Sequence, residues 1–169
     1  EIVRGIFENE IPEIANEVIE IKSIAREAGY RSKVAIVSND ENIDPIGSCV
    51  GQRGARIQTI ISELNGEKVD IILWDEDAVK FITNALSPAK IISVELNEEE
   101  KTAQVVVNED QLSLAIGRAG QNVRLASKLT GWNINIISGA GEPVAEDDEA
   151  ETEVEADEEK EVKKTKKKV

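Results

Sequence analysis

Apolar residues are distributed along residues 2–138 in two copies of one pattern. In each copy, two segments rich in Val and Ile precede two short helical segments, and a third strand-like segment follows. One more helical segment comes before each copy, at residues 2–9 ahead of Pro12 and at residues 78–86 ahead of Pro88. The predicted order is therefore α-β-β-α-α-β, twice. It predicts an α+β fold in which each copy forms a three-stranded sheet packed on helices.

The predicted strands form one hairpin and one single strand in each copy. In the first copy, segments 18–27 and 33–38 flank a turn at Ala28-Gly29, and segment 68–73 is the third strand. In the second copy, segments 90–96 and 102–107 flank the polar run 97–101, and segment 133–137 is the third strand. The β-branched residues of these segments favour extended backbone.

A repeat with an offset of 66 residues relates the two helical pairs. It carries Gly51-Gln52-Arg53-Gly54 onto Gly117-Arg118-Ala119-Gly120, so a Gly-X-X-Gly motif lies between the two helices of each copy. One such spacing arises by chance in a chain of this length, because glycine makes up about 7% of residues in proteins. Two Gly-X-X-Gly motifs at matching places in two matching units are not expected by chance. The offset also aligns apolar residues: Ile46 with Leu112, Cys49 with Ala115, Val50 with Ile116 and Ile57 with Val123.

Local signals predict how the first helix of each pair begins and packs. Asp44 and Asp110 are predicted N-caps, and Pro45 suits the first helical position. The apolar residues at i, i+3 and i+4, such as Ile46 and Cys49, are predicted to form one buried stripe. Cys49 is therefore expected to be a core residue, and Trp74 and Trp132 are expected to be packing residues.

The Gly-X-X-Gly motifs have the chemistry of a site for a polyanion backbone. Glycine lacks a Cβ, so a phosphodiester can approach the main chain closely. A helix begins at each motif, with unpaired N–H groups and a partial positive charge. Arg53, Arg56, Arg118 and Arg124 add full positive charges. An alternative interpretation is a helix-loop-helix corner in which the glycines only relieve backbone strain.

The distribution of charge supports this site, although the net charge of −14 does not. No Asp or Glu occurs in residues 45–62 or in residues 111–141, and these two windows contain both motifs. The local potential counts for more than the total, because salt screens charges beyond about 8–10 Å. The acidic and then basic run 142–168 has no aromatic residue and is predicted to be a disordered tail.

Composition excludes several classes of function. The chain has one cysteine and no histidine, which excludes an intramolecular disulfide, the usual zinc sites and histidine-based catalysis. We therefore expect no enzyme activity, no metal and no cofactor. Asp75-Glu76-Asp77 is interpreted as a helix N-terminus with favourable charge.

No apolar run is long enough for a membrane span, and we expect a cytoplasmic protein. The chain contains no methionine, so we expect further sequence ahead of Glu1.

The repeated helix, Gly-X-X-Gly loop and helix resemble the KH family, in the order of elements typical of its bacterial members. More narrowly, residues 44–54, 84–90 and 111–126 resemble the tandem KH region of the bacterial NusA family of transcription factors. The resemblance covers residues 1–138. It implies single-stranded, nascent RNA as the ligand, held by a factor that regulates transcription elongation, pausing, termination and antitermination. RNA polymerase contact is implied mainly through domains outside this chain, and we expect a monomer.

The KH resemblance assigns the candidate RNA-binding residues to the two loops and to the helix starts that follow them. In the first copy these are Gly51, Gln52, Arg53, Gly54, Arg56 and Ile57; in the second they are Gly117, Arg118, Ala119, Gly120, Gln121, Asn122 and Arg124. The predicted domains are residues 1–75 for the first KH domain, 76–138 for the second, and 139–169 for the tail. The alternative function is a protein-interaction module that acts through its acidic surface and tail.

Overall fold

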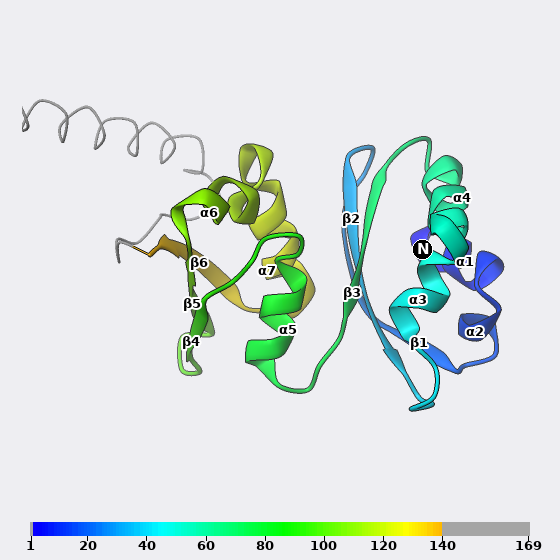
Figure 1. The fold of residues 1–169 in the computed structure, drawn as a ribbon, viewed down its shortest axis with the longest axis horizontal. Coiled ribbons are helices and arrows are strands. Elements are labelled where there is room, and N and C mark those ends of the chain that lie inside the picture. Colours follow the sequence, from blue (N-terminus) through cyan, green and yellow to red (C-terminus); the bar gives the residue numbers. More distant parts are fainter. Residues whose placement is uncertain (1, 140–169) are drawn as a thin grey trace, which may run out of the picture. The chain divides into compact units, whose positions relative to one another are not determined.

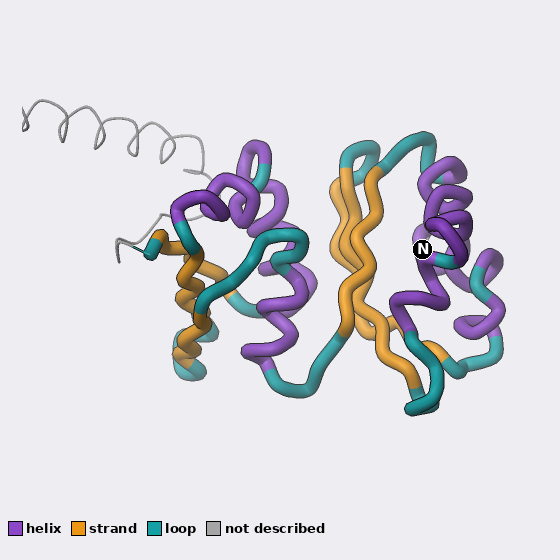
Figure 2. Tube along the Cα trace, in the orientation of Figure 1, coloured by secondary structure: helices purple, strands orange, loops and turns teal. Residues whose placement is uncertain are grey.

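The computed structural model describes residues 2–139, and the predicted tail lies outside them (Figure 1). Within these residues the chain forms two compact units, residues 2–87 with 128–130 and residues 88–127 with 131–139. Each unit has its own three-stranded sheet (Figure 2). The predicted α+β class and the predicted order of elements are confirmed. The domain boundary at residues 75 and 76 stays a prediction.

The first unit is a sheet with helices on one side. In the sheet β2 is central, antiparallel to β1 and parallel to β3. Helices α1, α2, α3 and α4 lie together on one face of this sheet (Figure 1). The elements are α1 (Ile2–Glu10), α2 (Pro12–Ala15), β1 (Ile19–Glu27), β2 (Arg31–Ser38), α3 (Pro45–Val50), α4 (Ala55–Glu63), β3 (Lys68–Leu73) and α5 (Ala78–Ala85).

The core of the first unit forms because side chains alternate along the strands. Val34 and Ile36 of β2 are fully buried in a cluster with Phe7 of α1 and Ile60 of α4. Cys49 of α3 joins the same cluster, which confirms it as a core residue. Burial raises the pKa of its thiol to about 12, so the thiolate is scarce at neutral pH.

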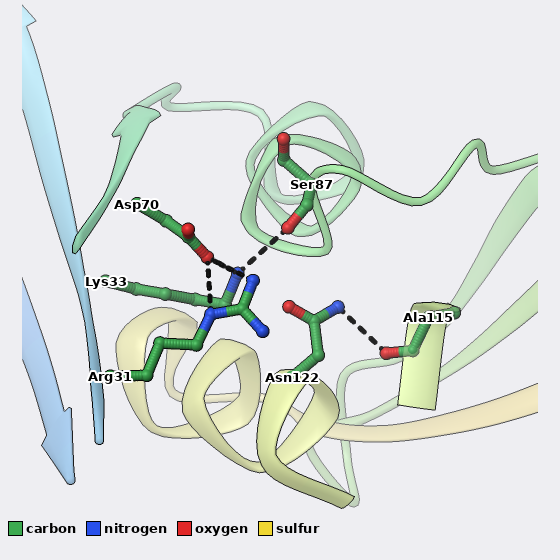
Figure 3. A network of polar contacts seen from close by, with 6 residues as sticks. All are labelled: Arg31, Lys33, Asp70, Ser87, Ala115 and Asn122. Atoms are coloured by element: carbon green, nitrogen blue, oxygen red, sulfur yellow. Dashed lines mark hydrogen bonds and ion pairs between the residues drawn. The ribbon is translucent and has the colours of Figure 1, made fainter. Parts of the chain in front are cut away.

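The opposite face of β2 carries buried charges. The Lys33 side chain is fully buried, and its Nζ donates hydrogen bonds to Asp70 Oδ2 at 2.8 Å and to the Ser87 carbonyl at 3.0 Å (Figure 3). Arg31 Nε donates to the same Asp70 oxygen at 2.9 Å. Burial lowers the pKa of Lys33 to about 8, although the attraction of Asp70 opposes this shift. The first sheet is therefore buried on both faces of its central strand.

The second unit repeats this topology with a sheet in the order β4-β5-β6. Along β5, Ala103, Val105 and Val107 are buried, whereas Gln104 on the other face is exposed. Strand β5 thus has one buried face and one more exposed face. The elements are β4 (Ser93–Asn97), β5 (Thr102–Val107), α6 (Glu109–Ile116), α7 (Gln121–Thr130) and β6 (Asn133–Ser138).

Three local predictions are wrong in detail. Asp110 is not an N-cap: Asn108 holds that position and Asp110 lies in the first turn of α6. No proline fixes the start of this helix, so it begins two residues earlier than the repeat with α3 implies. Ile46 is 36% exposed and does not belong to a buried stripe, whereas its counterpart Leu112 is buried. Strand β4 begins at Ser93, three residues later than predicted, and the amide of Lys90 donates to the Gln111 side chain.

Other local predictions are confirmed. Asp77 is the N-cap of α5, and its side chain accepts a hydrogen bond from the Val79 amide at 3.0 Å. Trp132 is buried, with Lys101 Nζ 4.5 Å from the centre of its ring. Trp74 packs with its ring centre 6.3 Å from that of Phe81. Both tryptophans are therefore packing residues.

Candidate nucleic-acid interface

The two Gly-X-X-Gly loops have the same backbone conformation. In the first loop, Gly51 has φ 78° and ψ 175°, and Gly54 has φ 73° and ψ 17°. In the second, Gly117 has φ 80° and ψ 170°, and Gly120 has φ 74° and ψ 10°. The conformation of the first glycine of each loop is open essentially to glycine alone. Both motifs therefore require glycine at this position for their backbone shape.

The residue before the second glycine is also left-handed in each loop. Arg53 has φ 55° and ψ 26°, and Ala119 has φ 54° and ψ 30°. Such a conformation costs a non-glycine residue on the order of 1 kcal/mol or more. The same cost at the same place in both units indicates that the surrounding contacts impose the loop shape.

The first glycine of each loop lies against the start of the following helix. A Cβ on Gly51 would come within 2.9 Å of Arg56 Cγ and 3.0 Å of the Arg56 backbone nitrogen. A Cβ on Gly117 would come within 2.7 Å of the Asn122 backbone nitrogen. Arg56 and Asn122 occupy equivalent positions, the second residue of α4 and of α7. The glycine thus lets the loop pack tightly on this residue in both units.

Exposed side chains fill the middle of each loop. Gln52 and Arg53 are exposed in the first loop, and Arg118 and Ala119 are exposed in the second. Within residues 2–139, the guanidinium groups of Arg53 and Arg118 make no hydrogen bond or ion pair. Each unit therefore presents one arginine at the tip of its loop, at the third position in the first loop and at the second position in the other.

The other predicted cations are engaged in contacts within the protein. Arg56 Nη1 donates to Glu13 Oε2 and to the Ser48 carbonyl, both at 2.8 Å. Arg124 Nη1 donates to the Ala119 carbonyl at 2.9 Å, which ties α7 to the left-handed residue of the second loop. Sequence reasoning missed Glu13, because it lies 43 residues before its partner Arg56.

Asn122 differs most from its predicted place. It is fully buried, and its Nδ2 donates to the Ala115 carbonyl at 2.9 Å (Figure 3). A buried amide cannot reach a ligand at the surface of the loop. Its neighbour Gln121 is half-buried at the first position of α7, and Ile57 is half-buried on α4. The structure thus brings the predicted residues together around each loop, but at different depths.

The backbone amides of each loop are partly engaged as well. The Gly54 amide donates to the Gly51 carbonyl and the Gly120 amide to the Gly117 carbonyl, at 3.2 and 3.1 Å. No side-chain hydrogen bond caps the N-terminus of α4 or α7 in the described part of the chain. The helix starts therefore keep a partial positive charge beside the exposed arginines.

An apolar side chain is also exposed on the preceding helix of each unit, Ile46 at 36% and Leu114 at 45%.

The order of elements, the two equivalent loops and the arginine on each of them define a tandem of KH domains. Residues 1–74 match the family described as the NusA-like first KH domain, and residues 78–142 match the NusA-like second KH domain. The chain therefore belongs to the NusA-like KH family.

Curated relatives support the same assignment. The chain is 56% identical over 137 residues to the transcription termination/antitermination protein NusA of Halalkalibacterium halodurans, and 55% identical to that of Bacillus subtilis. It is 58% identical over 134 residues to the same protein of Thermus thermophilus. These matches cover 81%, 81% and 79% of this chain but only 36%, 37% and 35% of the relatives. The chain thus spans about a third of their length.

A solved structure shares the fold. The crystal structure of APE1850 matches with a TM-score of 0.56 over 80% of this chain and 94% of that chain, at 24% sequence identity.

In residues 2–139 no helix is both long and apolar enough to cross a membrane. The same residues contain no cluster of three or more acidic, Cys or His side chains that could hold a metal ion.

Proposed function

We propose that this chain binds single-stranded RNA at the loops 51–54 and 117–120, as the RNA-holding part of a transcription termination or antitermination factor. The observation that carries the proposal is the exposed arginine at the tip of each loop, beside a helix start that no side chain caps. KH domains hold about four nucleotides of single-stranded RNA at such a loop. The relatives named above are transcription termination/antitermination proteins.

The arginines and the helix starts would contact phosphates, and the exposed apolar side chains would contact bases. Arg53 and Arg118 supply exposed positive charge, and the N-termini of α4 and α7 supply fixed dipoles. Ile46 and Leu114 offer apolar surface on the helix that precedes each loop. Few aromatic residues are present, so binding would depend less on stacking than in RRM or single-strand-binding OB domains.

In the cell, the ligand would be nascent RNA near the RNA polymerase elongation complex. We propose that this chain acts as a cytoplasmic monomer without catalytic activity, and that polymerase contact is made mainly by other domains of the full-length factor. The proposal predicts a preference for single-stranded over duplex RNA.

The test measures the affinity of labelled single-stranded RNA in a salt series. If three to five phosphates are neutralised, log K should fall against log salt with a slope of roughly −2 to −3.5. A quadruple variant, with Gln52, Arg53, Arg118 and Ala119 each replaced by Asp, should lose binding and keep its circular dichroism spectrum. Asp tolerates the left-handed backbone at positions 53 and 119.

A charge-matched pair of variants provides the control. Arg53→Gln with Arg118→Gln should reduce the magnitude of the slope by about 1.4. Lys80→Gln with Lys90→Gln makes the same change of net charge at exposed residues outside the two loops and should leave the slope nearly unchanged. Unchanged RNA affinity in the folded quadruple variant would refute the proposed site. No measurable RNA affinity, together with binding to a basic protein partner that is lost when residues 139–169 are deleted, would favour the protein-interaction alternative.

A further inference from the structure

We infer that Arg56 and Asn122 are positioning residues that fix the shape of the two loops and do not contact RNA themselves. The inference rests on the proposed function, because the shape matters for RNA binding only if RNA binds at the loops. It departs from the sequence-based prediction, which placed both residues among the RNA-binding residues. Three observations lead to it.

The first observation is that both side chains bond to the helix that precedes the loop. Arg56 Nη1 donates to the Ser48 carbonyl, and Asn122 Nδ2 donates to the Ala115 carbonyl, at 2.8 and 2.9 Å. Both carbonyls lie in the last turn of their helix, where backbone acceptors lack intrahelical partners. Two chemically different side chains therefore perform one task, which is to join the end of the first helix to the start of the second.

The second observation is that the same residues support the first glycine of each loop. The Gly51 backbone packs on Arg56 and the Gly117 backbone on Asn122, at distances that leave no room for a Cβ. The side chain that bonds to the preceding helix thus belongs to the residue that sets the path of the loop. A change in its position would move the glycine and the exposed residues that follow it.

The third observation is that neither side chain presents an unpaired charge to a phosphate. Arg56 Nη1 is paired with Glu13 Oε2 at 2.8 Å, so this carboxylate offsets the positive charge that an incoming phosphate would meet. Asn122 is fully buried. In contrast, Arg53 and Arg118 are exposed at the loop tips. The structure thus separates residues that present charge from residues that hold the loop.

The experiment compares how each variant changes the salt dependence of RNA binding. Removing a phosphate contact lowers the slope magnitude by about 0.7 for a single strand. Removing a positioning residue weakens binding at every salt concentration and leaves the slope the same. We expect Arg56→Ala and Asn122→Ala to lose about five- to tenfold in affinity at constant slope. Arg53→Gln and Arg118→Gln should each reduce the magnitude of the slope by about 0.7.

Two further variants sharpen the distinction for Arg56. Arg56→Asn places the side chain of the second unit in the first. It should recover part of the affinity that Arg56→Ala loses, because an amide at this position can donate to the carbonyl of Cys49, the residue equivalent to Ala115. Glu13→Gln removes the ion pair but leaves the charge of Arg56. If Arg56 were a phosphate ligand, this release would raise both affinity and slope; we expect neither to rise. A smaller slope magnitude for RNA binding in Arg56→Ala, or tighter RNA binding in Glu13→Gln, would overturn the inference.

Amide hydrogen exchange provides a readout that does not depend on RNA. The Gly54 and Gly120 amides are hydrogen-bonded inside their loops. Asn122→Ala should speed exchange at Gly120 and leave Gly54 unchanged, and Arg56→Ala should do the reverse. If the protein binds no RNA but these changes appear, the proposed function fails and the positioning role stands. Unchanged exchange in both folded variants would remove the positioning role.

Discussion

The two loops share one backbone but are held by different chemistry. In the first unit a charged side chain, Arg56, joins the helices and is itself held by Glu13, in an ion pair whose side chains are 36% and 27% exposed. In the second unit a neutral, fully buried amide, Asn122, also bonds to the last turn of the preceding helix, but at the Ala115 carbonyl, one residue further along the helix. Arg124 adds a bond to the loop carbonyl of Ala119. The comparison shows that the glycines and the path of the chain define this loop, and that the side chains supporting it can change.

The sheets differ in a related way. The central strand β2 of the first unit is buried on both faces and holds Lys33 and Arg31 against Asp70. The central strand β5 of the second unit exposes Gln104 on the corresponding face. The first unit therefore depends on buried charge, which is costly unless it is paired, and the second does not. The following predictions test these differences.

The largest expected effect is the destabilisation caused by Gly117→Ala. The new Cβ would come within 2.7 Å of the Asn122 backbone nitrogen, which cannot move without shifting α7, in a conformation that alanine rarely adopts. We expect a loss of about 3–4 kcal/mol in the free energy of unfolding of the second unit. Gly51→Ala should cost less, because part of its clash is with the flexible Arg56 side chain. Urea unfolding followed by Trp132 fluorescence in a Trp74→Phe background reports the second unit, and Trp74 fluorescence in a Trp132→Phe background reports the first. Equal losses would contradict the comparison.

The next effect is a pH dependence confined to the first unit. The pKa of Lys33 is lowered to about 8 in the folded protein from about 10.5. Between these values the unfolded chain binds more protons than the folded one, so the contribution of Lys33 to stability rises with pH. From pH 8 to 10.5 the rise should be on the order of 2–3 kcal/mol and should be absent in Lys33→Met.

A control for this pH series removes the thiol. The pKa of Cys49 is raised to about 12 by burial, so its contribution falls as pH rises above the ordinary thiol pKa, which is the opposite sign. The protein that keeps Lys33 and the Lys33→Met variant should therefore both carry Cys49→Ala. Urea unfolding at each pH, followed by Trp74 fluorescence, measures the difference. A difference in the free energy of unfolding between the two proteins that stays constant from pH 8 to 10.5 would contradict the prediction.

The smallest effect concerns the exposed ion pair at the first loop. Glu13→Gln should lower the stability of the first unit by only about 0.5 kcal/mol, because water and salt screen a pair at this exposure. The loss should shrink in high salt. Glu8→Gln, at an exposed glutamate on α1, is the matched control and should have no effect. A loss of several kcal/mol in Glu13→Gln would mean that the ionic contact dominates the loop.

Much of the fold followed from the sequence because its signals are local. The β-branched segments, the helical spacing of apolar residues and the 66-residue repeat predicted the order of elements in both units. The glycines predicted a loop between the two helices of each unit, and only glycine tolerates the conformation found at Gly51 and Gly117. Where a local signal differed between copies, prediction by the repeat failed: Pro45 begins α3, but nothing comparable delays the start of α6.

The sequence by itself determined the two-copy architecture and the place of the two loops, because backbone preferences act over a few residues. Only the tertiary structure decided which side chains around the loops face solvent. The pairing of Arg56 with Glu13 and the burial of Asn122 and Lys33 depend on segments that are distant in the chain or on packing depth. A polar residue near a glycine loop has the same sequence signature whether it presents a charge or supports the backbone, because contacts and burial arise only when the elements pack together.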